Sequence, residues 1–364
     1  MRVALVHDYL KEYGGAERVL EALHEAFPEA DVYTSVFLPS YLGPHRERFK
    51  DWKIHTSFLQ YIPFKAKLMS PMRLLTPWAF KSFDFSRYDV IITSATGAYF
   101  PNTLNKRTAR LYCYCHTPPR YLYGYATARQ WKNNAFLRVI GETLNHFLRM
   151  VDFNASKNVD QYIANSEEVR GRIQKFYRKD ALVIYPPVDL SPAAKDKQKR
   201  EYFLTGGRLA RAKHVDIIVK ACKELDLPLK VFGKAFAGYG EELERMSGKK
   251  TEFVGEVTDQ EKLDLMAGAK AFLFASEDED FGITPVEAMG QGTPVIAYRS
   301  GGVKETVEEN VSGLFFDQLT VESLKEQLKL FDKKRFKSED CRARAEKFSK
   351  DKFLNSITSL VTKK

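Results

Sequence analysis

The feature that most constrains the fold is a repeated alternation of strand-like and helix-like segments. The chain opens with RVALVH, an apolar run suited to a buried strand, and continues through the loop DYLKEYGG into AERVLEALHEAF. In that last segment Val19, Leu20, Leu23 and Phe27 recur at helical spacing on one face. Strands that alternate with helices build a parallel sheet, because parallel neighbours need a crossover connection. The pattern therefore predicts an α/β fold.

A proline-rich segment divides this alternation into two blocks. Before it, DVYTSVF, DVIITSA, RLYCYCH and QYIANS are further expected strands, and Ser166 is placed to cap the helix that follows the last of them. Residues 181–200 combine three prolines with a charged polar run, which is typical of a linker, and the alternation then restarts. We therefore expect two Rossmann-like α/β/α domains facing a central cleft, with residues 1–185 in the first and 186–345 in the second.

Composition narrows the class of protein. With 44% hydrophobic and 29% charged residues, the chain is typical of globular proteins rather than disordered ones. Its four cysteines are too few and too scattered for a disulfide framework and indicate a reducing compartment. MRVALVHDYL lacks the apolar core of a signal peptide, and no run is long and apolar enough to span a membrane. We expect a cytoplasmic protein that is at most peripheral on the inner face of the cell membrane.

The net charge of +10 is confined to one region. Residues 51–150 account for all of it, because basic and acidic residues balance in the rest of the chain. A localised basic surface indicates an anionic partner, which could be phospholipid, nucleic acid or a phosphorylated substrate. Segments 58–83 and 128–150 mix Trp, Phe, Leu and Met with Lys and Arg, as helices at a membrane interface do. For the second segment a core helix is the favoured alternative. Its apolar stripe consists of Phe136, Val139, Ile140, Leu144, Phe147 and Leu148.

Two carboxylates in SEDEDFGITPVEAMGQGTPVIAY, Glu279 and Glu287, flank a short helix-like segment. Thr284 and Pro285 have the properties of an N-cap and a first helical residue, so Glu287 would complete a capping box. A short helix after a strand and a glycine loop aims its free N–H groups out of the sheet, which makes an anion site suited to phosphate. A carboxylate such as Glu279 beside a phosphate is unfavourable unless it holds hydroxyl groups, and sugars carry those groups.

A second anion-binding element is predicted in TGGRLARAKHVD. This segment places Arg208 and Lys213 after a double glycine at the end of an expected strand. Arginine binds phosphate oxygens in bidentate fashion, and lysine acts as a point charge. Either residue alone could be a solvated surface cation. Their position after a strand-end glycine turn in the same domain favours phosphate binding.

Several of these motifs, in this order, resemble those of one enzyme family. The segment from Glu279 to Glu287 looks like the E-x7-E signature of glycosyltransferase family 4, the retaining sugar transferases of the two-Rossmann GT-B fold. GGRLARAKHVD is similar to the family's phosphate-binding segment, HDYLKEYGGAERV to its first glycine loop, and GGVKETVEENVSGLFF to the turn and strand after the E-x7-E segment. FSKDKFLNSITSLV resembles the family's last helix, so a helix within residues 346–364 is expected to cross back to the first domain.

The resemblance implies a donor site in the carboxyl-terminal domain. Glu279 would bond the hydroxyls of the transferred sugar, and Glu287 would hold those of the nucleotide's ribose. Arg208 and Lys213 would neutralise the diphosphate and stabilise its charge as the glycosidic bond breaks. The chain between the two carboxylates would also contact the donor, through Phe281, Gly282, Ile283 and Thr284.

In the amino-terminal domain the resemblance points to a glycine turn and a histidine. Gly14 and Gly15 would let the backbone approach the diphosphate closely, and His116 matches the family's active-site histidine near the reacting sugar. His116 could instead be a buried core residue, or a zinc ligand with the two cysteines before it, but the other cysteines are distant in sequence. The DED at residues 278–280 precedes a phosphate site that cations already serve. We expect no metal ion and no other cofactor.

These expectations describe a retaining glycosyltransferase of cell-surface polysaccharide or glycolipid synthesis. It would move a hexose from a nucleotide-diphosphate sugar to a glycan or lipid-linked acceptor, by a front-face reaction in which the leaving phosphate oxygen helps to remove the acceptor's proton. RLYCYCHTPPRYLYGY resembles the O-antigen mannosyltransferase subgroup, which favours GDP-mannose as donor, with UDP-sugars as the alternative. We expect an anionic membrane surface as a further partner, and no nucleic acid.

Three other classes of protein fit parts of the sequence. A nucleotide-sugar 2-epimerase of the same fold would turn over its donor without an acceptor. A dinucleotide dehydrogenase is disfavoured because no G-x-G-x-x-G follows the first strand. A nucleic-acid-binding protein would explain the basic region but would give the paired carboxylates no purpose.

Overall fold

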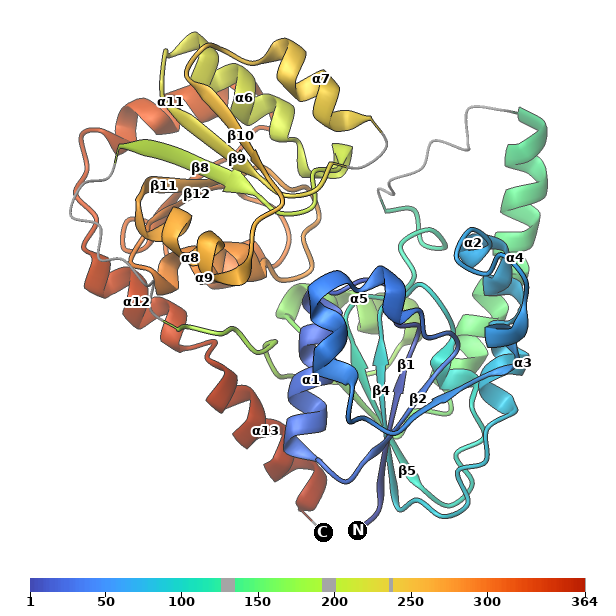
Figure 1. The fold of residues 1–364 in the computed structure, drawn as a ribbon. Coiled ribbons are helices and arrows are strands. Elements are labelled where there is room, and N and C mark those ends of the chain that lie inside the picture. Colours follow the sequence, from blue (N-terminus) through green and yellow to red (C-terminus); the bar gives the residue numbers. More distant parts are fainter. Residues whose placement is uncertain (126–134, 192–200, 236–237, 364) are drawn as a thin grey trace. The chain divides into compact units, whose positions relative to one another are not determined.

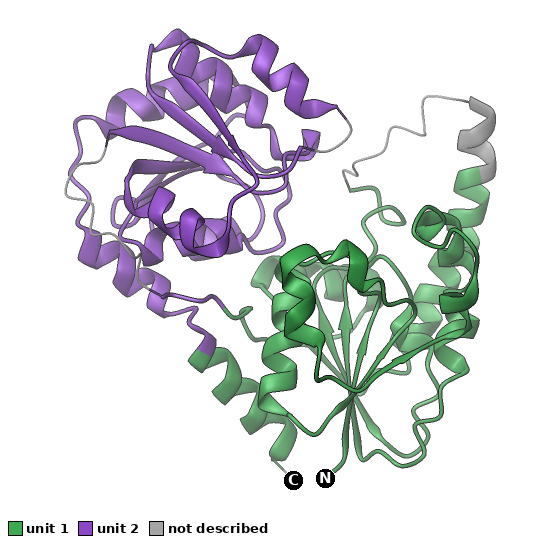
Figure 2. Cartoon of the chain, in the orientation of Figure 1, with its two compact units in different colours: residues 1–187, 351–364 green, residues 188–350 purple. Residues whose placement is uncertain are grey.

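The chain forms two compact units, each built on its own sheet. The computed structural model describes residues 1–125, 135–191, 201–235 and 238–363, and for residues 135–140 it describes the backbone only (Figure 1). Unit 1 contains residues 1–187 and 351–364, and unit 2 contains residues 188–350 (Figure 2).

Unit 1 is organised around a seven-stranded sheet in which every neighbouring pair is parallel. Its strand order is β3-β2-β1-β4-β5-β6-β7. The order reverses at β1, so the carboxyl ends of β1 and β4 lie where ligands bind in open α/β sheets. The strands are β1 (Val3–His7), β2 (Asp31–Thr34), β3 (Ile54–Thr56), β4 (Val90–Ala95), β5 (Arg110–Cys115), β6 (Gln161–Ala164) and β7 (Ala181–Val183).

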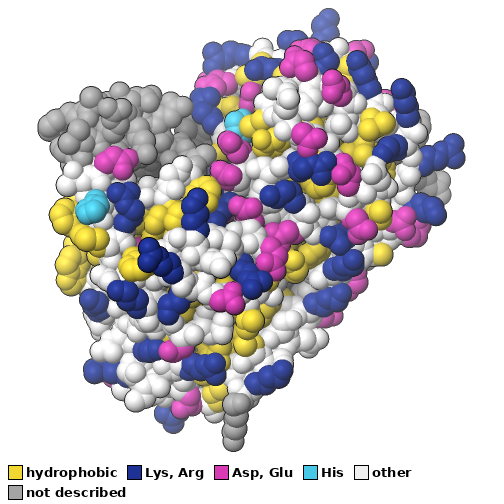
Figure 3. All heavy atoms as spheres, turned by 180° about the vertical axis from the view of Figure 1, so that it is seen from behind, with side chains coloured by type: hydrophobic (Ala, Val, Ile, Leu, Met, Phe, Trp, Pro, Cys, Tyr) yellow, Lys and Arg dark blue, Asp and Glu magenta, His cyan; other side chains and the backbone are white. Residues whose placement is uncertain are grey.

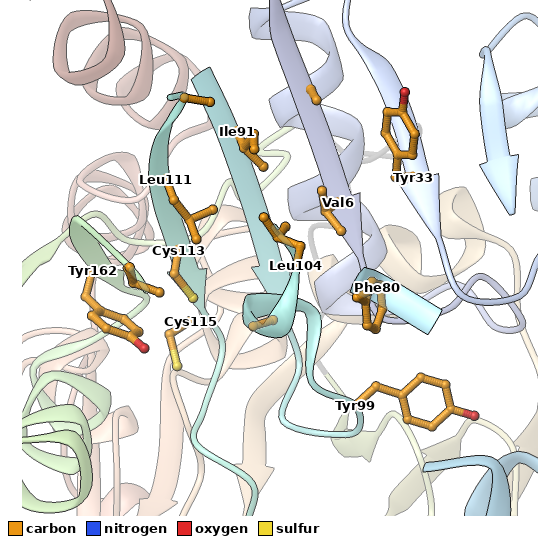
Figure 4. Close-up of a cluster of buried hydrophobic side chains, with 14 of the residues drawn as sticks. Val6, Tyr33, Phe80, Ile91, Tyr99, Leu104, Leu111, Cys113, Cys115 and Tyr162 are labelled. Atoms are coloured by element: carbon orange, nitrogen blue, oxygen red, sulfur yellow. The ribbon is translucent and has the colours of Figure 1, made fainter. Parts of the chain in front are cut away.

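Helices cover both faces of this sheet. Apolar side chains of α1 and α13 pack with those of β1, β4 and β5 on one face. The other face packs on a second buried cluster that includes Phe80 of α3 and Ile173 of α5 (Figure 4). The helices of unit 1 are α1 (Gly15–Ala26), α2 (Met69–Met72), α3 (Thr76–Lys81), α4 (Ala135–Ser156), α5 (Glu167–Tyr177) and α13 (Lys350–Thr362), whose first residue belongs to unit 2.

Unit 2 contains a six-stranded sheet, again with all described pairs parallel, in the order β10-β9-β8-β11-β12-β13. Its strands are β8 (Tyr202–Gly206), β9 (Leu229–Phe232), β10 (Thr251–Gly255), β11 (Ala269–Phe274), β12 (Val295–Tyr298) and β13 (Gly313–Phe316). Its helices are α6 (Val215–Glu224), α7 (Tyr239–Met246), α8 (Asp259–Ala267), α9 (Ile283–Gly290), α10 (Val303–Thr306), α11 (Val321–Phe331) and α12 (Ser338–Glu346).

The predicted α/β class with two Rossmann-like units is confirmed. The strands expected from RVALVH, DVYTSVF, DVIITSA, RLYCYCH and QYIANS all form, and the Ser166 hydroxyl accepts a hydrogen bond from the Val169 N–H at 3.0 Å, as expected for an N-cap. Strands β3 and β7 were not predicted, and β7 occupies the first residues of the segment interpreted as a linker. The rest of that linker, residues 192–200, lies outside the described residues.

The apolar stripe expected in segment 128–150 is only partly described. Residues 128–134 and the side chains of Phe136, Val139 and Ile140 lie outside the described part of the chain. Farther along α4, Leu148 is buried with Phe100 and Leu122, whereas Leu144 and Phe147 are 41% and 55% exposed. Within the described residues, no helix is both long enough and apolar enough to cross a bilayer.

Candidate active site

The acidic loop of unit 2 leads directly into helix α9. Glu279 lies in the loop after β11, and α9 begins at Ile283 with Gly282 as its N-cap at φ = +92°. The predicted capping box of Thr284 and Glu287 is therefore wrong, because Thr284 is already inside the helix and no side chain caps it. Gly282 causes the difference: its left-handed conformation, which favours glycine, lets the helix start earlier than the threonine-proline signal indicated.

Glu287 is instead held by a lysine that sequence reasoning missed. Its side chain is 4% exposed, and its Oε1 accepts a hydrogen bond from the Lys262 Nζ of α8 at 2.6 Å. Lys262 is itself only 12% exposed. A buried carboxylate needs such a partner, because desolvation of an unpaired charge is expensive. No local pattern could have indicated this pair, since the two residues lie on different helices.

Glu279 and Lys213 meet, although they are far apart in sequence. The Glu279 Oε2 forms an ion pair with the Lys213 Nζ and accepts a hydrogen bond from the Ser276 Oγ at 2.7 Å. Lys213 ends the short 3₁₀ turn Arg211–Lys213, which follows the strand-end glycines of β8. The structure thus brings together the residue predicted for the sugar and one of those predicted for the diphosphate. Ser276 was not predicted.

The glycine turn after β8 packs close to the start of α9. A Cβ on Gly207, where φ is +118°, would lie 4.0 Å from the Thr284 Oγ1. A Cβ on Gly233 would lie only 1.8 Å from the Gly207 carbonyl oxygen, so these two turns can pack together only with glycine there. Arg208, directly after this turn, has an exposed side chain at the same edge of the sheet.

A second glycine pair, Gly301 and Gly302, was predicted only as part of the turn after the E-x7-E segment, and it fixes the backbone of the acidic loop. The Gly302 N–H donates to the Glu279 carbonyl oxygen at 2.7 Å. A Cβ would lie 2.2 Å from that same oxygen if added to Gly301, and 2.4 Å from the Asp280 oxygen if added to Gly302. These contacts require glycine, and the double glycine at the end of β12 was the signal that could have indicated them.

The arrangement in unit 2 suits a ligand that carries both phosphate and hydroxyl groups. The first N–H groups of α9, at Ile283 and Thr284, have no intrahelical partners and attract an anion. The Lys213 ammonium, paired with Glu279 in the loop that leads into α9, adds a positive charge to the same region. The Glu279 and Glu287 carboxylates can accept hydrogen bonds from hydroxyls. Phe281 is 2% exposed and packs on Phe348 with ring centroids 5.5 Å apart, which anchors the loop.

In unit 1, His116 lies just beyond the carboxyl end of β5. Its side chain is 9% exposed, and its Nε2 is hydrogen-bonded to the Ser94 Oγ at 2.9 Å. The His116 carbonyl oxygen accepts a hydrogen bond from the Asn165 Nδ2 at 3.0 Å. Burial, together with the neighbouring His7, lowers the pKa of His116 to about 3, so its ring is neutral near pH 7.

The predicted glycine turn lies at the same edge of the unit 1 sheet. Gly14 is the N-cap of α1 and Gly15 its first residue. The Gly14 N–H donates to the Glu17 Oε2 at 2.8 Å, which fixes the turn from inside the helix.

The cysteines before His116 do not form a zinc site with it. Cys113 and Cys115 point into the buried cluster of one sheet face (Figure 4), whereas His116 bonds to Ser94 on the face covered by α1. Among the described residues, no group of three His, Cys, Asp or Glu side chains is arranged to hold a metal ion. That the reaction needs no metal stays a prediction.

Comparison with known proteins identifies the family. Residues 13–192 match the family model described as Glycosyltransferase Family 4, and residues 189–348 match the one described as Glycosyl transferases group 1. The chain belongs to glycosyltransferase family 4. As a member of this family it is an enzyme that transfers a sugar, and the predicted resemblance is confirmed.

Similar family members and structures are known. Two relatives are named alpha-1,3/1,6-mannosyltransferase ALG2. The protein from Mus musculus is 25% identical over 76% of this chain and 74% of its own length. The protein from Homo sapiens is 24% identical over 76% of this chain and 73% of its own length. Sucrose-phosphate synthase from Thermosynechococcus elongatus has a TM-score of 0.75 at 19% identity, over 99% of this chain and 98% of that one. Anabaena Alr3699/HepE, solved with UDP and glucose, has a TM-score of 0.74 at 19% identity over 100% of both chains. At such identities the structures establish the GT-B fold alone.

Proposed function

We propose that this glycosyltransferase moves a mannosyl residue, with retention of configuration, from GDP-mannose to a glycan or lipid-linked acceptor of cell-surface polysaccharide or glycolipid synthesis. The observation that carries the proposal is the meeting of Lys213 and Glu279 beside the first turn of α9. The Lys213 ammonium can bind phosphate, and the adjacent Glu279 carboxylate can bind hydroxyl groups. A nucleotide-activated sugar carries both phosphate and hydroxyl groups.

Each residue has a defined task in this proposal. The diphosphate binds to the N–H groups of α9, to Lys213 and to Arg208, and these groups stabilise the negative charge that develops on it as the glycosidic bond breaks. Glu279 accepts hydrogen bonds from hydroxyls of the hexose, and Glu287, oriented by Lys262, accepts them from the ribose. The leaving phosphate oxygen takes the proton of the acceptor hydroxyl as the new bond forms on the same face.

Unit 1 contributes the groups that the family places near the reacting atoms. His116, neutral near pH 7, accepts or donates a hydrogen bond at the transferred sugar, and the turn at Gly14 and Gly15 approaches the diphosphate through its backbone.

The proposed donor has two parts, the mannose that is transferred and the guanine base of the nucleotide, and they rest on different observations. The two mannosyltransferase relatives and the segment RLYCYCHTPPRYLYGY favour mannose, and mannose favours a guanine donor. The Anabaena structure, which contains UDP, keeps a UDP-sugar as the alternative donor.

Thermal unfolding in a panel of nucleotide-sugars tests the donor. A ligand present at 100 times its Kd raises the free energy of unfolding by about 2.7 kcal/mol, so the true donor should stand out. We expect GDP-mannose to raise the midpoint more than UDP-glucose or UDP-galactose, and a larger shift with a UDP-sugar would assign the alternative. Release of GDP that does not require an acceptor would favour an epimerase or a hydrolase.

Site variants test the residue roles. Glu279→Gln and Lys213→Ala should fold normally and lose transfer activity, because each removes a charge that the donor complex uses. Glu277→Gln is the matched control: Glu277 lies in the same loop, but it faces His214 at 3.7 Å and is 45% exposed. Full turnover by Glu279→Gln or Lys213→Ala would refute the site assignment.

We also propose that residues 58–83 dock this enzyme on an anionic phospholipid bilayer. Leu59, Met72 and Ala79 pack inward in a small cluster with Val36 and Leu38. Large apolar side chains nevertheless also face outward: Phe58, Tyr61, Phe64, Leu68, Leu74, Leu75 and Trp78 are each at least 37% exposed. The segment holds several lysines and no acidic residue, so its charge complements an anionic surface. A neighbouring apolar surface belongs to α4, where Leu144 and Phe147 are 41% and 55% exposed. In Figure 3, which views the molecule from behind, hydrophobic side chains gather at the edge where α4 lies, with Lys and Arg near them.

Liposome flotation tests this docking. The protein should float with vesicles that contain phosphatidylglycerol and much less with pure phosphatidylcholine. Replacing Phe64 and Trp78, which are 80% and 63% exposed, by serine should abolish the difference. Leu330→Ser, an exposed position of unit 2, is the control and should leave flotation unchanged. Equal recovery with both vesicle types would count against the proposal.

A further inference from the structure

A line of buried polar side chains connects the glycine turn of unit 1 to His116. Glu17 accepts a hydrogen bond from the Gly14 N–H, and its other oxygen, Oε1, lies 3.6 Å from the His7 Nε2. The His7 Nδ1 is 3.0 Å from the Ser94 Oγ, and that oxygen is 2.9 Å from the His116 Nε2. His7 and Ser94 have no exposed surface, and Glu17 is 5% exposed.

The topology of the sheet explains how these residues meet. His7 and Ser94 are register partners at the carboxyl ends of the adjacent parallel strands β1 and β4. The His116 N–H donates to the Ala95 carbonyl oxygen, which places His116 at the same level beyond β5. Helix α1 covers this face of the sheet and directs Glu17 of its first turn toward His7. Side chains from three strands and one helix therefore converge at one edge.

The hydrogen-bonding capacity of these groups limits how protons can be arranged. The Glu17 carboxylate, 3.6 Å away, is beyond hydrogen-bond distance of the His7 Nε2, but it attracts a proton on that nitrogen and repels a lone pair there, so the favoured tautomer of a neutral His7 carries its proton on Nε2. A second proton on His7 would create an imidazolium with no exposed surface. Glu17 would compensate it poorly, because their 3.6 Å separation exceeds the 2.7–2.9 Å or so of a charge-assisted hydrogen bond. The His7 Nδ1 is then an acceptor, and the Ser94 hydroxyl must donate to it.

That direction determines the state of His116. A hydroxyl has one proton, so once Ser94 donates to His7, its oxygen can only accept from the His116 Nε2. His116 must then carry its proton on Nε2, and its Nδ1 has a free lone pair. No described residue forms a hydrogen bond with that Nδ1. The ring thus offers one acceptor nitrogen outside the line.

We propose that Glu17, His7 and Ser94 are positioning residues that hold His116 as its Nε2–H tautomer, with Nδ1 presented as a hydrogen-bond acceptor. The role of that acceptor rests on the function proposed above: it receives a hydrogen bond from a hydroxyl of the transferred hexose. Because Glu17 also holds the Gly14 N–H, the line orients His116 and the glycine turn together.

Imidazole ¹H–¹⁵N correlation spectra test the tautomer without any assay of activity. The chain has only seven histidines, so His116 can be assigned by its loss in a His116→Gln variant. We expect a neutral Nε2–H ring for His116 in the wild-type protein and a mixture of tautomers in Ser94→Ala. A His116 ring with its proton on Nδ1, or a pattern unchanged in Ser94→Ala, would overturn the proposal.

Matched variants separate this effect from a loss of packing. Thr93→Val removes the neighbouring hydroxyl of β4, which bonds to the Asn102 Oδ1 rather than to the line, and should leave the His116 tautomer unchanged. His7→Asn keeps an acceptor close to the place of Nδ1 and should preserve the tautomer, whereas His7→Leu should release it. Release by Thr93→Val, or retention in His7→Leu, would contradict the proposal.

Kinetics then test the consequence for transfer. Ser94→Ala should lower kcat about tenfold, the cost of one weakened hydrogen bond to the reacting sugar. It should change the donor KM by less than about twofold, because Glu17 still holds the Gly14 turn and the cationic phosphate contacts lie in unit 2. A change confined to KM would argue against a positioning role. If the wild-type protein transfers no sugar, the proposed function fails, but the spectra still decide whether the line fixes His116.

Discussion

The buried ion pair between Lys262 and Glu287 gives the sharpest test of the donor site. Lys262→Met removes the ammonium but keeps most of the side-chain volume, so it leaves the Glu287 carboxylate, 4% exposed, without its 2.6 Å partner. Removing one member of a buried pair costs roughly 3–5 kcal/mol, because the charge that remains is desolvated and has lost its partner of opposite charge. We expect a loss of that size in the free energy of unfolding of the variant.

An exposed pair with the same geometry is the control. The Lys250 Nζ also lies 2.6 Å from a carboxylate, that of Asp226, but the two side chains are 51% and 80% exposed. Exposed pairs contribute about 0–1 kcal/mol, because water screens the charges and the side chains lose entropy when they are fixed. Lys250→Met should therefore cost at least 2 kcal/mol or so less than Lys262→Met.

A double-mutant cycle isolates the interaction itself. Urea unfolding of Lys262→Met, Glu287→Gln and the double variant should give a coupling energy of about 2 kcal/mol or more, since the double variant has neither charge to leave unpaired. If Lys262→Met costs no more than Lys250→Met, or the two single losses simply add, then Lys262 does not compensate Glu287 and our account of how this carboxylate is oriented is refuted.

Three further predictions concern the loop, a buried acid and a helix cap. Gly302→Ala should lower turnover at least about tenfold while the protein still folds, because its Cβ would lie 2.4 Å from the Asp280 carbonyl oxygen. Gly171→Ala is the control, because a Cβ there would have no atom within 4 Å. Comparable turnover of the two variants would contradict this reasoning. Burial raises the pKa of Asp152 to about 7, although hydrogen bonds from Tyr123 and Tyr177 act to lower it. The folded protein therefore binds a proton at Asp152 more tightly than the unfolded chain does. The free energy of unfolding consequently falls as pH rises from about 4 through 7. Between pH 5 and pH 8 the wild-type protein should therefore lose about 2–3 kcal/mol more unfolding free energy than Asp152→Asn, and parallel pH profiles would refute the assignment. Ser166→Ala should cost about 1 kcal/mol in urea unfolding by removing the N-cap of α5, and a neutral effect would show that the cap contributes little.

The sequence predicted the central strands because their apolar runs are long and fully buried. All residues of β1, β2 and β4 are buried, and such runs are readily recognised. Strand β3 consists of three half-buried residues, and β7 has one exposed position, Leu182, among three. Both are short edge strands that need little apolar surface, so composition and alternation could not indicate them.

The start of α9 shows a limit of reading caps from residue type. Thr284 and Pro285 fit the positions N-cap and N1 well, but a glycine with positive φ two residues earlier also starts a helix without any side-chain cap. Whether the helix starts at the glycine or at the threonine depends on the conformation of the loop that precedes it. Here Gly301 and Gly302 pack against residues 279–281 and fix that loop. Those contacts are not local in sequence.

The candidate site was predictable where the chemistry is local, and not where it depends on pairing. Glu279, Lys213 and the glycine turns could be selected from their positions beside expected strand ends. Lys262 could not, because a lysine within a surface-like helix has no feature that distinguishes it until α8 packs on α9. His7 and Ser94 are single polar residues in apolar strands, and only the register of β1 with β4 brings their side chains together.

The two sheets use their carboxyl edges in physically different ways. In unit 2 that edge is made of glycines, among them Gly206, Gly207, Gly233 and Gly301, so backbone groups and a few charges can approach a large anionic ligand closely. In unit 1 the edge carries a row of buried polar side chains, in which the Ser94 hydroxyl is hydrogen-bonded to both His7 and His116 and Glu17 faces His7 at 3.6 Å. An edge rich in glycine gives contact area but little control over the orientation of one group. A line of buried polar side chains fixes one group but holds no large ligand. Transfer of a sugar from a nucleotide needs both, because most of the binding energy comes from the nucleotide while the chemistry occurs at one carbon.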